Sequence, residues 1–341
     1  MPAFITHYLY GTDVYHNILP SYIKAIIKEH TGSYNLGLQG PDIFYYHIPS
    51  SIRPSEYNIG NQMHETKIST FFQNYMSWLT SYCGEEFYVG LSYLCGMLCH
   101  YTLDSKVHPY IYYRSGYDPS IKGSNRDSFP MHSLLESTID KILLYEKRRL
   151  QPSQFYPPKT IYLKPIELTV VTKLLSDCIN QTYFRDPTVR NKRPLTSPSS
   201  IRNIILSMKL ESLLLHDSTG KRRRIVTYLS RYIKPASILS SLIVTDDLDD
   251  EFDSCNLTHA KWYNPWDKNL SSNDSFYNLY EKSLKHYQDI IQELYRYISR
   301  TKTIRESDSI PITLGKEPVN PLSSLLCKIQ NLSYHSGLDM E

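Results

Sequence analysis

The chain has 341 residues, of which 41% are hydrophobic and 21% charged, and this balance excludes collagen, coiled coils and wholesale disorder. Its 37 basic and 34 acidic residues leave a formal net charge of +3, which is too small for a protein dedicated to binding polyanions. The length suffices for one large domain or two modest ones with a sizeable core.

The N-terminal residues and the cysteine pattern favour a reduced, cytoplasmic protein. Residues 1–10 lack the basic and apolar regions of a secretory leader. The longest apolar stretch, residues 89–99, has half the length of a membrane span. The six cysteines show neither a CxxC pair nor the spacing of a disulfide framework. We therefore expect no signal peptide and no transmembrane segment, and contact with lipid only from the aqueous side.

Helical periodicity begins in the first third of the chain. Apolar residues recur at i, i+3, i+4, i+7 and i+11 over residues 68–79, which predicts an amphipathic helix. A second helix is expected over residues 86–104, and we expect it to end before Pro109 because the residue before a proline avoids the helical region. A start signal at residues 127–130 predicts a third helix that runs to residue 143.

The second half of the chain continues this pattern. Later helices are expected over residues 168–180, 200–216, 222–233 and 276–298, and the last keeps helical register for six turns. No stretch alternates with a period of two between turn dipeptides, so sheet is expected to be minor. The predicted fold class is all-α, a helical bundle.

Three segments differ in composition from these helices. Residues 185–200 are rich in proline, serine and arginine and are predicted to be a loop insertion. The acidic run 246–254 is predicted to be a solvated loop. Residues 301–341 are polar with scattered prolines, which predicts a flexible tail that adds little to the core. The expected organisation is one helical domain over residues 1–300 followed by this tail.

Histidine is concentrated in the first 132 residues, which hold eight of the 12. His100 precedes Asp104 by four residues, and His132 precedes Glu136 by four, on predicted helices. This spacing puts both side chains of a pair on one helix face, about 5–6 Å apart at Cβ, so both reach one cation. A single pair is usually a solvated or ion-paired helix face, but the recurrence favours a metal site. Imidazole and carboxylate without thiolate are typical of catalytic zinc.

Five short motifs carry these residues, and their order and spacing are specific although each motif alone is weak. They are Thr6-His7-Tyr8, Gly37-Leu38-Gln39-Gly40-Pro41-Asp42, Met63-His64-Glu65, Cys99-His100-Tyr101-x-Leu103-Asp104 with His108-Pro109, and His132-x-x-x-Glu136. Residues 261–266, followed by the long last helix, look like the closing segment of the same family. The chain resembles the zinc-dependent phospholipase C family, in particular its cytosolic clostridial-type relatives, and the match is strongest over residues 1–140.

The resemblance implies a helical bundle of the zinc-dependent phospholipase C and zinc nuclease type, with two or three zinc ions in its core. One ion would be held by Asp42, His64, His100 and Asp104. A second would be held by His108, His132 and Glu136. A third would be held by His7 with a bridging Asp104, and in the family an N-terminal tryptophan completes that site. Because this chain has no such tryptophan, we expect the amine of Pro2 to substitute after removal of Met1.

The same resemblance implies a zinc metallohydrolase that cleaves a phospholipid between glycerol and phosphate with a metal-activated water, which Asp42 orients or deprotonates. One alternative is a single-strand-specific nuclease of the same fold, although residues 37–42 look more like the phospholipases. A second alternative is a non-catalytic helical metal-binding module. The presence of the full ligand set argues against this second alternative. The expected partner is a phospholipid, at a membrane surface, and nucleic acid is less favoured.

Three further features of the sequence are interpreted in structural terms. The aromatic run Phe44–Tyr46 has two possible interpretations, an aromatic wall that binds a headgroup cation or packing beside the metal site. Trp262 and Trp266 are interpreted as anchors for the final helix. His335 and the other histidines outside the motifs are interpreted as surface or core residues. The sequence determines neither the headgroup nor the oligomeric state.

Overall fold

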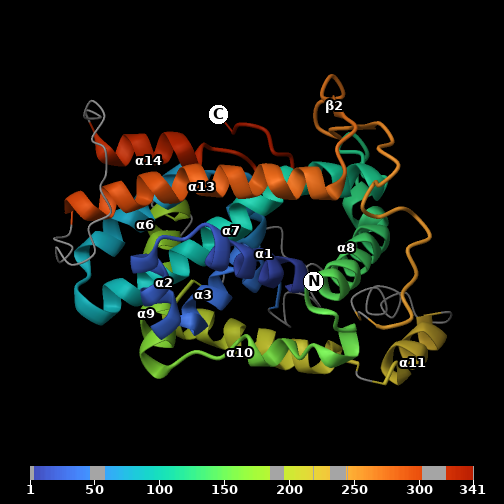
Figure 1. Ribbon diagram of the computed structural model, residues 1–341, viewed down its shortest axis with the longest axis horizontal. Coiled ribbons are helices and arrows are strands. Elements are labelled where there is room, and N and C mark those ends of the chain that lie inside the picture. Colours follow the sequence, from blue (N-terminus) through green and yellow to red (C-terminus); the bar gives the residue numbers. More distant parts are fainter. Residues whose placement is uncertain are drawn as a thin grey trace.

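The described part of the chain is built mainly of helices, as the sequence predicts, and Figure 1 shows their arrangement. The computed structural model describes residues 4–46, 58–184, 196–217, 219–230, 243, 245–301 and 320–340. The all-α fold class is confirmed. Within the described ranges, sheet is limited to the antiparallel pair β1 (Trp262–Tyr263) and β2 (Ser271–Ser272), in which Trp262 pairs with Ser272.

The N-terminal half contains the elements that later position the candidate site. They are α1 (Phe4–Asn17), α2 (Ser21–Glu29), α3 (Thr31–Gly37), the 3-10 helix η1 (Gly40–Tyr46), α5 (Ile59–Glu65), α6 (Ile68–Ser81), α7 (Gly84–Arg114) and α8 (Ser124–Arg148). The second half adds η2 (Pro152–Gln154), η3 (Pro157–Lys159), α9 (Pro165–Tyr183), α10 (Pro198–Leu215), α11 (Lys221–Ser230), α13 (Phe276–Thr301) and α14 (Pro321–Ile329).

Helix α7 crosses the middle of the molecule, with α13 and α14 on one side and α10 on the other (Figure 1). It is apolar around most of its circumference, and such a helix is stable only when other helices cover it. Its closest neighbour is α3, because Gly37 and Gly96 lie where the two backbones meet, and a Cβ on either glycine would overlap a carbonyl oxygen of the other helix. This contact holds the segment after α3 over the middle of α7.

Helix α7 does not end before Pro109 but continues to Arg114, so the predicted end of this helix was wrong. Proline in a helix removes one backbone hydrogen bond and costs about 3 kcal/mol. Here Val107, Tyr110 and Ile111 on both sides of the proline are buried, and their packing offsets that cost. Tertiary burial therefore outweighs a local helix-breaking signal.

Helix α8 begins at Ser124, earlier than the predicted start at residues 127–130, and Pro130 lies inside it. The turn that precedes Pro130 is exposed at residues 125–127. A carbonyl freed by a proline in an exposed turn keeps water as its partner, so this proline is tolerated.

The other predicted helices are confirmed with small changes at their ends. Residues 68–79 lie in α6, 168–180 in α9, 200–215 in α10 and 276–298 in α13. The prediction over 222–233 corresponds to α11, and its last three residues lie outside the described ones. Residues 185–195 of the predicted loop insertion also lie outside them, and its last three residues begin α10.

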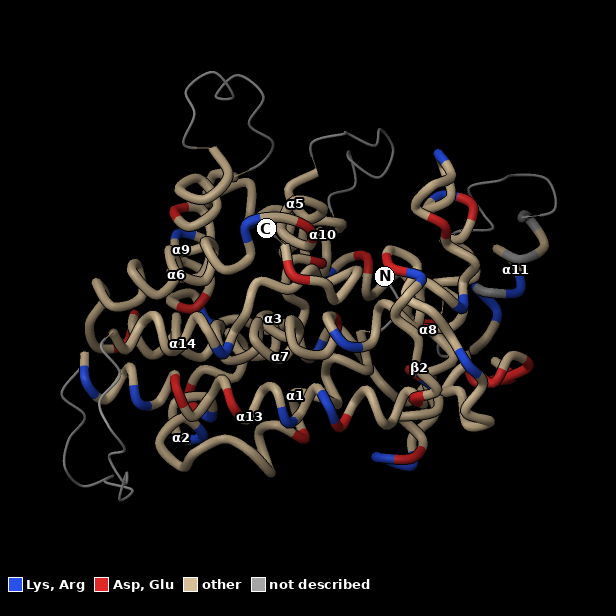
Figure 2. The backbone as a smooth tube through the Cα atoms, turned by 90° about the horizontal axis from the view of Figure 1, so that it is seen from above, with Lys and Arg blue, Asp and Glu red and all other residues tan. Residues whose placement is uncertain are grey.

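The acidic run 246–254 lies in a loop, as expected, but it is only partly solvated. Leu248 and Ser254 are buried, and Asp246 accepts hydrogen bonds from the backbone N–H and hydroxyl of Ser153. The loop is therefore attached to the helical body. Figure 2 shows basic and acidic residues interspersed over the described elements, in keeping with the small net charge.

The prediction of a polar tail that adds little to the core was wrong for residues 320–340, while residues 302–319 lie outside the described ones. Helix α14 packs along α13, and Leu325, Ile329 and Tyr334 belong to the hydrophobic core. Four apolar residues of α14 recur at i, i+3, i+4 and i+7, namely Leu322, Leu325, Leu326 and Ile329. This signal is too short to stand out within a polar segment, so only the packed structure reveals it.

Trp262 and Trp266 pack against α7, and their rings lie 5.7 and 5.0 Å from those of Tyr110 and Tyr112. They hold the segment that precedes α13 onto the central helix. None of the helices in the described ranges combines the length and the apolar character needed to cross a membrane.

Candidate metal centre

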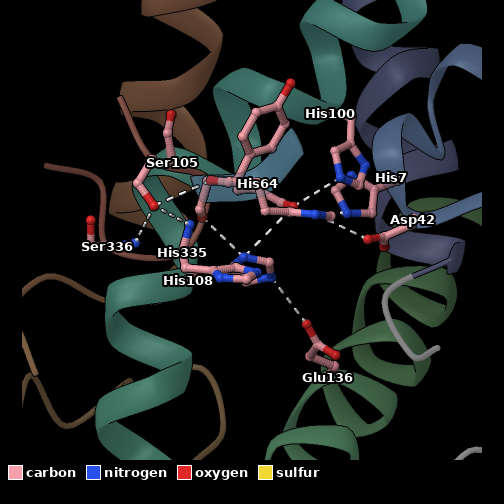
Figure 3. A network of polar contacts seen from close by, with 12 residues as sticks. His7, Asp42, His64, His100, Ser105, His108, Glu136, His335 and Ser336 are labelled. Atoms are coloured by element: carbon pink, nitrogen blue, oxygen red, sulfur yellow. Dashed lines mark hydrogen bonds and ion pairs between the residues drawn. The ribbon is translucent and has the colours of Figure 1, made fainter. Parts of the chain in front are cut away.

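Five elements bring all eight predicted ligands together in the interior, and Figure 3 labels His7, Asp42, His64, His100, His108 and Glu136 among them. Helix α1 carries His7, η1 carries Asp42, α5 carries His64, α7 carries His100, Asp104 and His108, and α8 carries His132 and Glu136. Three groups have ligand atoms within 4.8 Å of one another, namely His7, Asp42 and His100, then His64, His100 and Asp104, and finally His108, His132 and Glu136. The structure therefore unites motifs that are far apart in the sequence.

The carboxylate of Asp104 lies between two histidines. Its Oδ1 is 3.2 Å from Nε2 of His7, and its Oδ2 is 2.9 Å from Nε2 of His100. The two imidazole rings stack with centroids 4.1 Å apart. Beside them, Nε2 of His64 lies 3.1 Å from Oδ1 of Asp42. One carboxylate thus faces several nitrogen donors, which is the arrangement expected of a bridging ligand.

The first two of these three sets share His100 and together form one group around Asp104, and the third set forms a second group between α7 and α8. Oε1 of Glu136 is 3.4 Å from Nε2 of His108 and 3.3 Å from Nε2 of His132. The four-residue spacing of His132 and Glu136 on α8 puts both on the face that meets α7. His108 also approaches Asp104, with Nδ1 3.6 Å from Oδ2, so the two groups adjoin.

Backbone carbonyls fix the tautomers of three of these histidines. Nδ1 of His64 lies 2.7 Å from the carbonyl oxygen of Gly60, and Nδ1 of His100 lies 3.1 Å from that of Leu38. Nδ1 of His108 lies 3.1 Å from the carbonyl oxygen of Tyr334. A carbonyl oxygen only accepts, so each Nδ1 carries the proton when the ring is neutral. In the neutral ring, Nε2 then carries the lone pair that a metal-binding histidine offers to an ion.

Mutual charge interactions keep the carboxylates ionised despite their burial. Burial alone would raise the pKa of Asp42, but its hydrogen bond with His64 and the nearby His100 outweigh this and lower the pKa. Burial likewise opposes ionisation of Asp104, but His100, His108 and His7 hold its pKa well below the usual value. These carboxylates are negatively charged at neutral pH, and cationic ligands are favoured beside them.

The pair Glu136 and His108 shows the same balance. Burial would raise the pKa of Glu136, but the charge of His132 and the hydrogen bonds from both histidines bring it to about 2. Burial would lower the pKa of His108, but Asp104 and Glu136 raise it to about 9. His108 therefore carries a positive charge at neutral pH beside these two carboxylates.

Unpaired buried atoms support the fit of this centre to metal ions. Nδ1 of His7, Nε2 of His100 and Oδ2 of Asp104 have no hydrogen-bond partner among the described residues. The last two lie 2.9 Å apart and belong to the group of His64, His100 and Asp104, whose ligand atoms are within 4.8 Å of one another. Leaving a buried polar atom unpaired costs about 1–3 kcal/mol, and a bound cation removes that cost. Imidazole nitrogen with carboxylate oxygen is a donor set that suits zinc.

The cysteines take no part in these groups. Cys95 and Cys99 lie on α7 next to the site, but both are buried, and burial raises the pKa of Cys99 to about 12. A thiol with so high a pKa is a poor metal ligand because the thiolate is the form that binds. The ligand set in the described part of the chain therefore consists of nitrogen and oxygen atoms, as the sequence indicates.

Sequence reasoning missed the contribution of the C-terminal residues. The ring of His335 stacks on that of His64, with centroids 4.8 Å apart, and lies 5.9 Å from that of His108. His335 is a partly buried residue beside the candidate ligands, whereas the sequence left it as an ordinary surface or core histidine. It stands in no motif with the other ligands, so no local signal marked it. Pro2, the expected third-site ligand, lies outside the described residues.

The aromatic run after Asp42 packs beside the centre. Phe44 and Tyr46 are buried in the core, and the ring of Tyr45 stacks on His64 with centroids 5.6 Å apart. Of the two interpretations of this run, packing beside the metal site has direct support. Tyr112 plays a similar part on α7, with its ring 4.7 Å from that of His132.

Comparison with known proteins agrees with this geometry. The family model for zinc dependent phospholipase C matches residues 6–185, which is more than half of the chain and includes all eight predicted ligands. Searches of curated proteins and of solved structures returned no significant match. The match ends well before α13, α14 and His335. The chain belongs to the zinc-dependent phospholipase C family.

Proposed function

We propose that this protein is a zinc-dependent hydrolase that cleaves the phosphodiester of a phospholipid between glycerol and phosphate. The observation that carries the proposal is the position of Asp104, whose carboxylate faces His7, His100 and His108 while its Oδ2 finds no hydrogen-bond partner among the described residues. A carboxylate shared among several histidines suits a cluster of ions, and such clusters stabilise both the attacking and the leaving oxygens of a phosphodiester.

The residues of the centre would divide among two or three ions. One side would use Asp42, His64, His100, Asp104 and His7, and the other side would use His108, His132 and Glu136. Bound zinc supplies Lewis-acid chemistry, in that it acidifies water and offsets the negative charge that develops on phosphate oxygens. The buried carbonyl contacts of His64, His100 and His108 orient their rings before any ion arrives.

Asp42 is the residue that we propose to handle the proton of the attacking water. Its side chain is 15% exposed, against 3% for Asp104, so it is more open to solvent than that carboxylate. It is ionised at neutral pH, and His64 fixes one of its oxygens. The other oxygen accepts the proton as the water oxygen bonds to phosphorus. The bond from phosphorus to the glycerol oxygen then breaks, and that oxygen takes up a proton.

Two experiments test this function. The first is elemental analysis of the full chain purified without chelator or nickel affinity, for which we expect two or three zinc ions per chain. The second compares hydrolysis of phospholipid vesicles with hydrolysis of single-stranded DNA, for which we expect diacylglycerol and a phosphorylated headgroup from the vesicles. Asp42→Asn is expected to lower this activity strongly, while Asp177→Asn, which alters an ion pair with Lys173 on α9, is the matched control.

The alternatives predict other outcomes of the same experiments. Release of nucleotides with intact vesicles would identify the nuclease of this fold. Bound zinc without hydrolysis of either substrate would identify the non-catalytic metal-binding module. A chain that binds one ion or none after incubation with zinc would contradict the proposed hydrolase.

A further inference from the structure

The C-terminal strap, which we define as residues 331–340, is a closed loop seated against α5 and α7 (Figures 2 and 3). Leu332 pairs with Asp339, and the N–H of Ser333 donates to the carbonyl oxygen of Leu338 at 2.8 Å. The side chain of Asn331 accepts from the N–H of Ser69 at 3.0 Å, which attaches the strap to α6. The strap is therefore a folded element with its own internal bonds.

One residue of the strap contacts both ligand groups. The backbone N–H of Tyr334 donates to the carbonyl oxygen of His64 at 2.9 Å, and its carbonyl oxygen accepts from Nδ1 of His108 at 3.1 Å. Its ring is 1% exposed and lies 5.1 Å from the ring of His64 and 5.9 Å from that of His100. A shift of Tyr334 would consequently disturb His64 in one group and His108 in the other.

The next residue, His335, holds the end of α5. Its ring is nearly parallel to that of His64, with an angle of 16° between them. Its Nδ1 lies 3.3 Å from Oε1 of Glu65, the neighbour of His64 in the chain. Stacking and the contact with Glu65 together restrict the rotation of the His64 ring. His335 is not part of any of the ligand groups found among the described residues, in keeping with a supporting role.

The strap is anchored to α7 next to Asp104. Gly337 has φ +65°, and a Cβ there would overlap the carbonyl oxygen of Ser105. Only glycine allows this approach, because both the backbone angle and the space exclude a side chain. The side chain of Asn264 donates to the carbonyl oxygen of Ser336 at 2.8 Å and fixes the same turn from the β1 side. The strap therefore has little freedom to move without losing these contacts.

We propose that the C-terminal strap is a positioning element of the metal centre, which holds His64 and His108 and thereby links zinc binding at the two ligand groups through Tyr334. The inference rests on the proposed function for the identity of the ion. The family match ends at residue 185, so nothing in that match assigns a role to the strap. Residues that orient metal-binding histidines typically change metal affinity by 10- to 100-fold when they are altered, which is roughly the effect expected here.

The first test displaces the strap without touching a ligand. Gly337→Ala pushes it away from α7, and we expect zinc affinity of the full chain, measured by competition with a chelator, to fall by roughly 10- to 100-fold at both groups. Gly220→Ala is the matched control, since Gly220 has φ +68° but its Cβ would have no atom within 4 Å in the described part of the chain. Circular dichroism and thermal unfolding without zinc verify that both variants fold.

The second test distinguishes a role of His335 in orienting His64 from direct zinc binding by His335. His335→Ala removes the ring that stacks on His64 and is expected to weaken zinc binding, whereas His335→Phe keeps a stacking ring and is expected to restore most of the affinity. The absorption spectrum of the cobalt-substituted protein provides an independent readout, and it is expected to change in His335→Ala but not in Gly220→Ala.

The outcomes distinguish this inference from the proposed function. If wild-type protein binds zinc and Gly337→Ala binds it equally well, the positioning role is overturned while the hydrolase remains. Equal losses in His335→Ala and His335→Phe would also overturn it, because they would make His335 a ligand. If the wild-type chain binds no zinc, the proposed function fails and the inference fails with it.

Discussion

His7 on α1 and Asp104 on α7 face each other, with Nε2 of the histidine 3.2 Å from Oδ1 of the carboxylate. The other oxygen of Asp104 lies 2.9 Å from Nε2 of His100, so each oxygen of this carboxylate has an imidazole nitrogen beside it. Its side chain is 3% exposed, and it is the residue on which the first motif and the central helix converge.

Asp104→Asn is expected to remove at least one zinc ion per chain. The asparagine amide is uncharged and has one acceptor oxygen instead of two. It therefore cannot bind one ion beside His7 and a second ion beside His100 at the same time. Phospholipid hydrolysis is expected to fall by more than about 100-fold, the upper range for residues that only support a ligand. Elemental analysis and a vesicle assay measure both effects. Asp177→Asn controls for loss of an acidic side chain, and full zinc content in Asp104→Asn would contradict the bridging role.

Zinc binding at the second group is expected to release protons and to tighten as the pH rises. The pKa of His108 is about 9 in the ion-free chain, because Asp104 and Glu136 outweigh the effect of burial. Since zinc binds only the neutral imidazole, affinity should increase by about tenfold per pH unit below pH 9 for each proton released. Calorimetry in buffers of different ionisation enthalpy measures this release. Binding without proton release would contradict the raised pKa.

The stability of the ion-free chain is expected to depend on the same pair. The pKa of His108 is raised, so its stabilising contribution is complete below pH 6.5 and declines as the pH rises through about 9. The pKa of Glu136 is lowered, so its contribution is complete above pH 4.5 and is lost as the pH falls through about 2. The pair therefore stabilises most between about pH 4.5 and 6.5. Urea unfolding of Glu136→Gln without zinc should show no loss of this contribution near pH 2 and a weaker decline towards pH 9, because Asp104 still raises the pKa of His108.

Gly40→Ala is expected to disturb the metal centre without changing any ligand. Gly40 has φ +48°, and a Cβ there would lie 2.5 Å from Cγ of His100. The imidazole would have to leave its bond to the carbonyl of Leu38, so zinc affinity and hydrolysis should fall. Gly116→Ala is the control, with φ +75° and open space around the added Cβ among the described residues. Unchanged zinc affinity in Gly40→Ala would show that His100 tolerates displacement.

Asp140→Asn is expected to loosen the start of α1, which carries His7. The carboxylate of Asp140 accepts from the N–H of Ile5 at 3.2 Å and from the N–H and hydroxyl of Thr6 at 2.7 and 2.6 Å. The amide of asparagine accepts hydrogen bonds only through its oxygen, so at least one of these three donors loses its partner. The free energy of unfolding should therefore fall by about 1–3 kcal/mol. Urea unfolding at pH 7.5 measures the change.

Asp140 also predicts a change of stability with pH. Burial raises its pKa to about 7, in spite of the bonds from Thr6 and Ile5. The folded chain therefore holds this proton more tightly than the unfolded chain, and the contribution of Asp140 is present below about pH 4 and is lost as the pH rises through 7. Asp140→Asn should remove this pH-dependent loss of stability. The difference in unfolding free energy between wild type and variant should therefore be smaller at pH 7.5 than at pH 5. An identical difference at both values would contradict the raised pKa.

Much of the metal centre was predictable because its signals are local. His100 with Asp104 and His132 with Glu136 are four residues apart, and the helical repeat alone puts each pair on one face. The extent of α6, α9 and α13 followed from apolar periodicity in the same way. Pro109 was misleading, since a local rule against proline in helices cannot register the burial of Tyr110 and Ile111 around it.

By itself, the sequence determined an all-α chain whose histidines and carboxylates have the spacing and the motifs of a zinc hydrolase family. Only the tertiary structure decided which elements converge on Asp104 and that the C-terminal strap lies against His64 and His108. The bond from His108 to the carbonyl of Tyr334 joins residues 226 positions apart. Such a bond follows from the packing of α5, α7 and the strap, and no local periodicity encodes it, because side-chain patterns report which face of an element is buried and not which distant backbone covers that face.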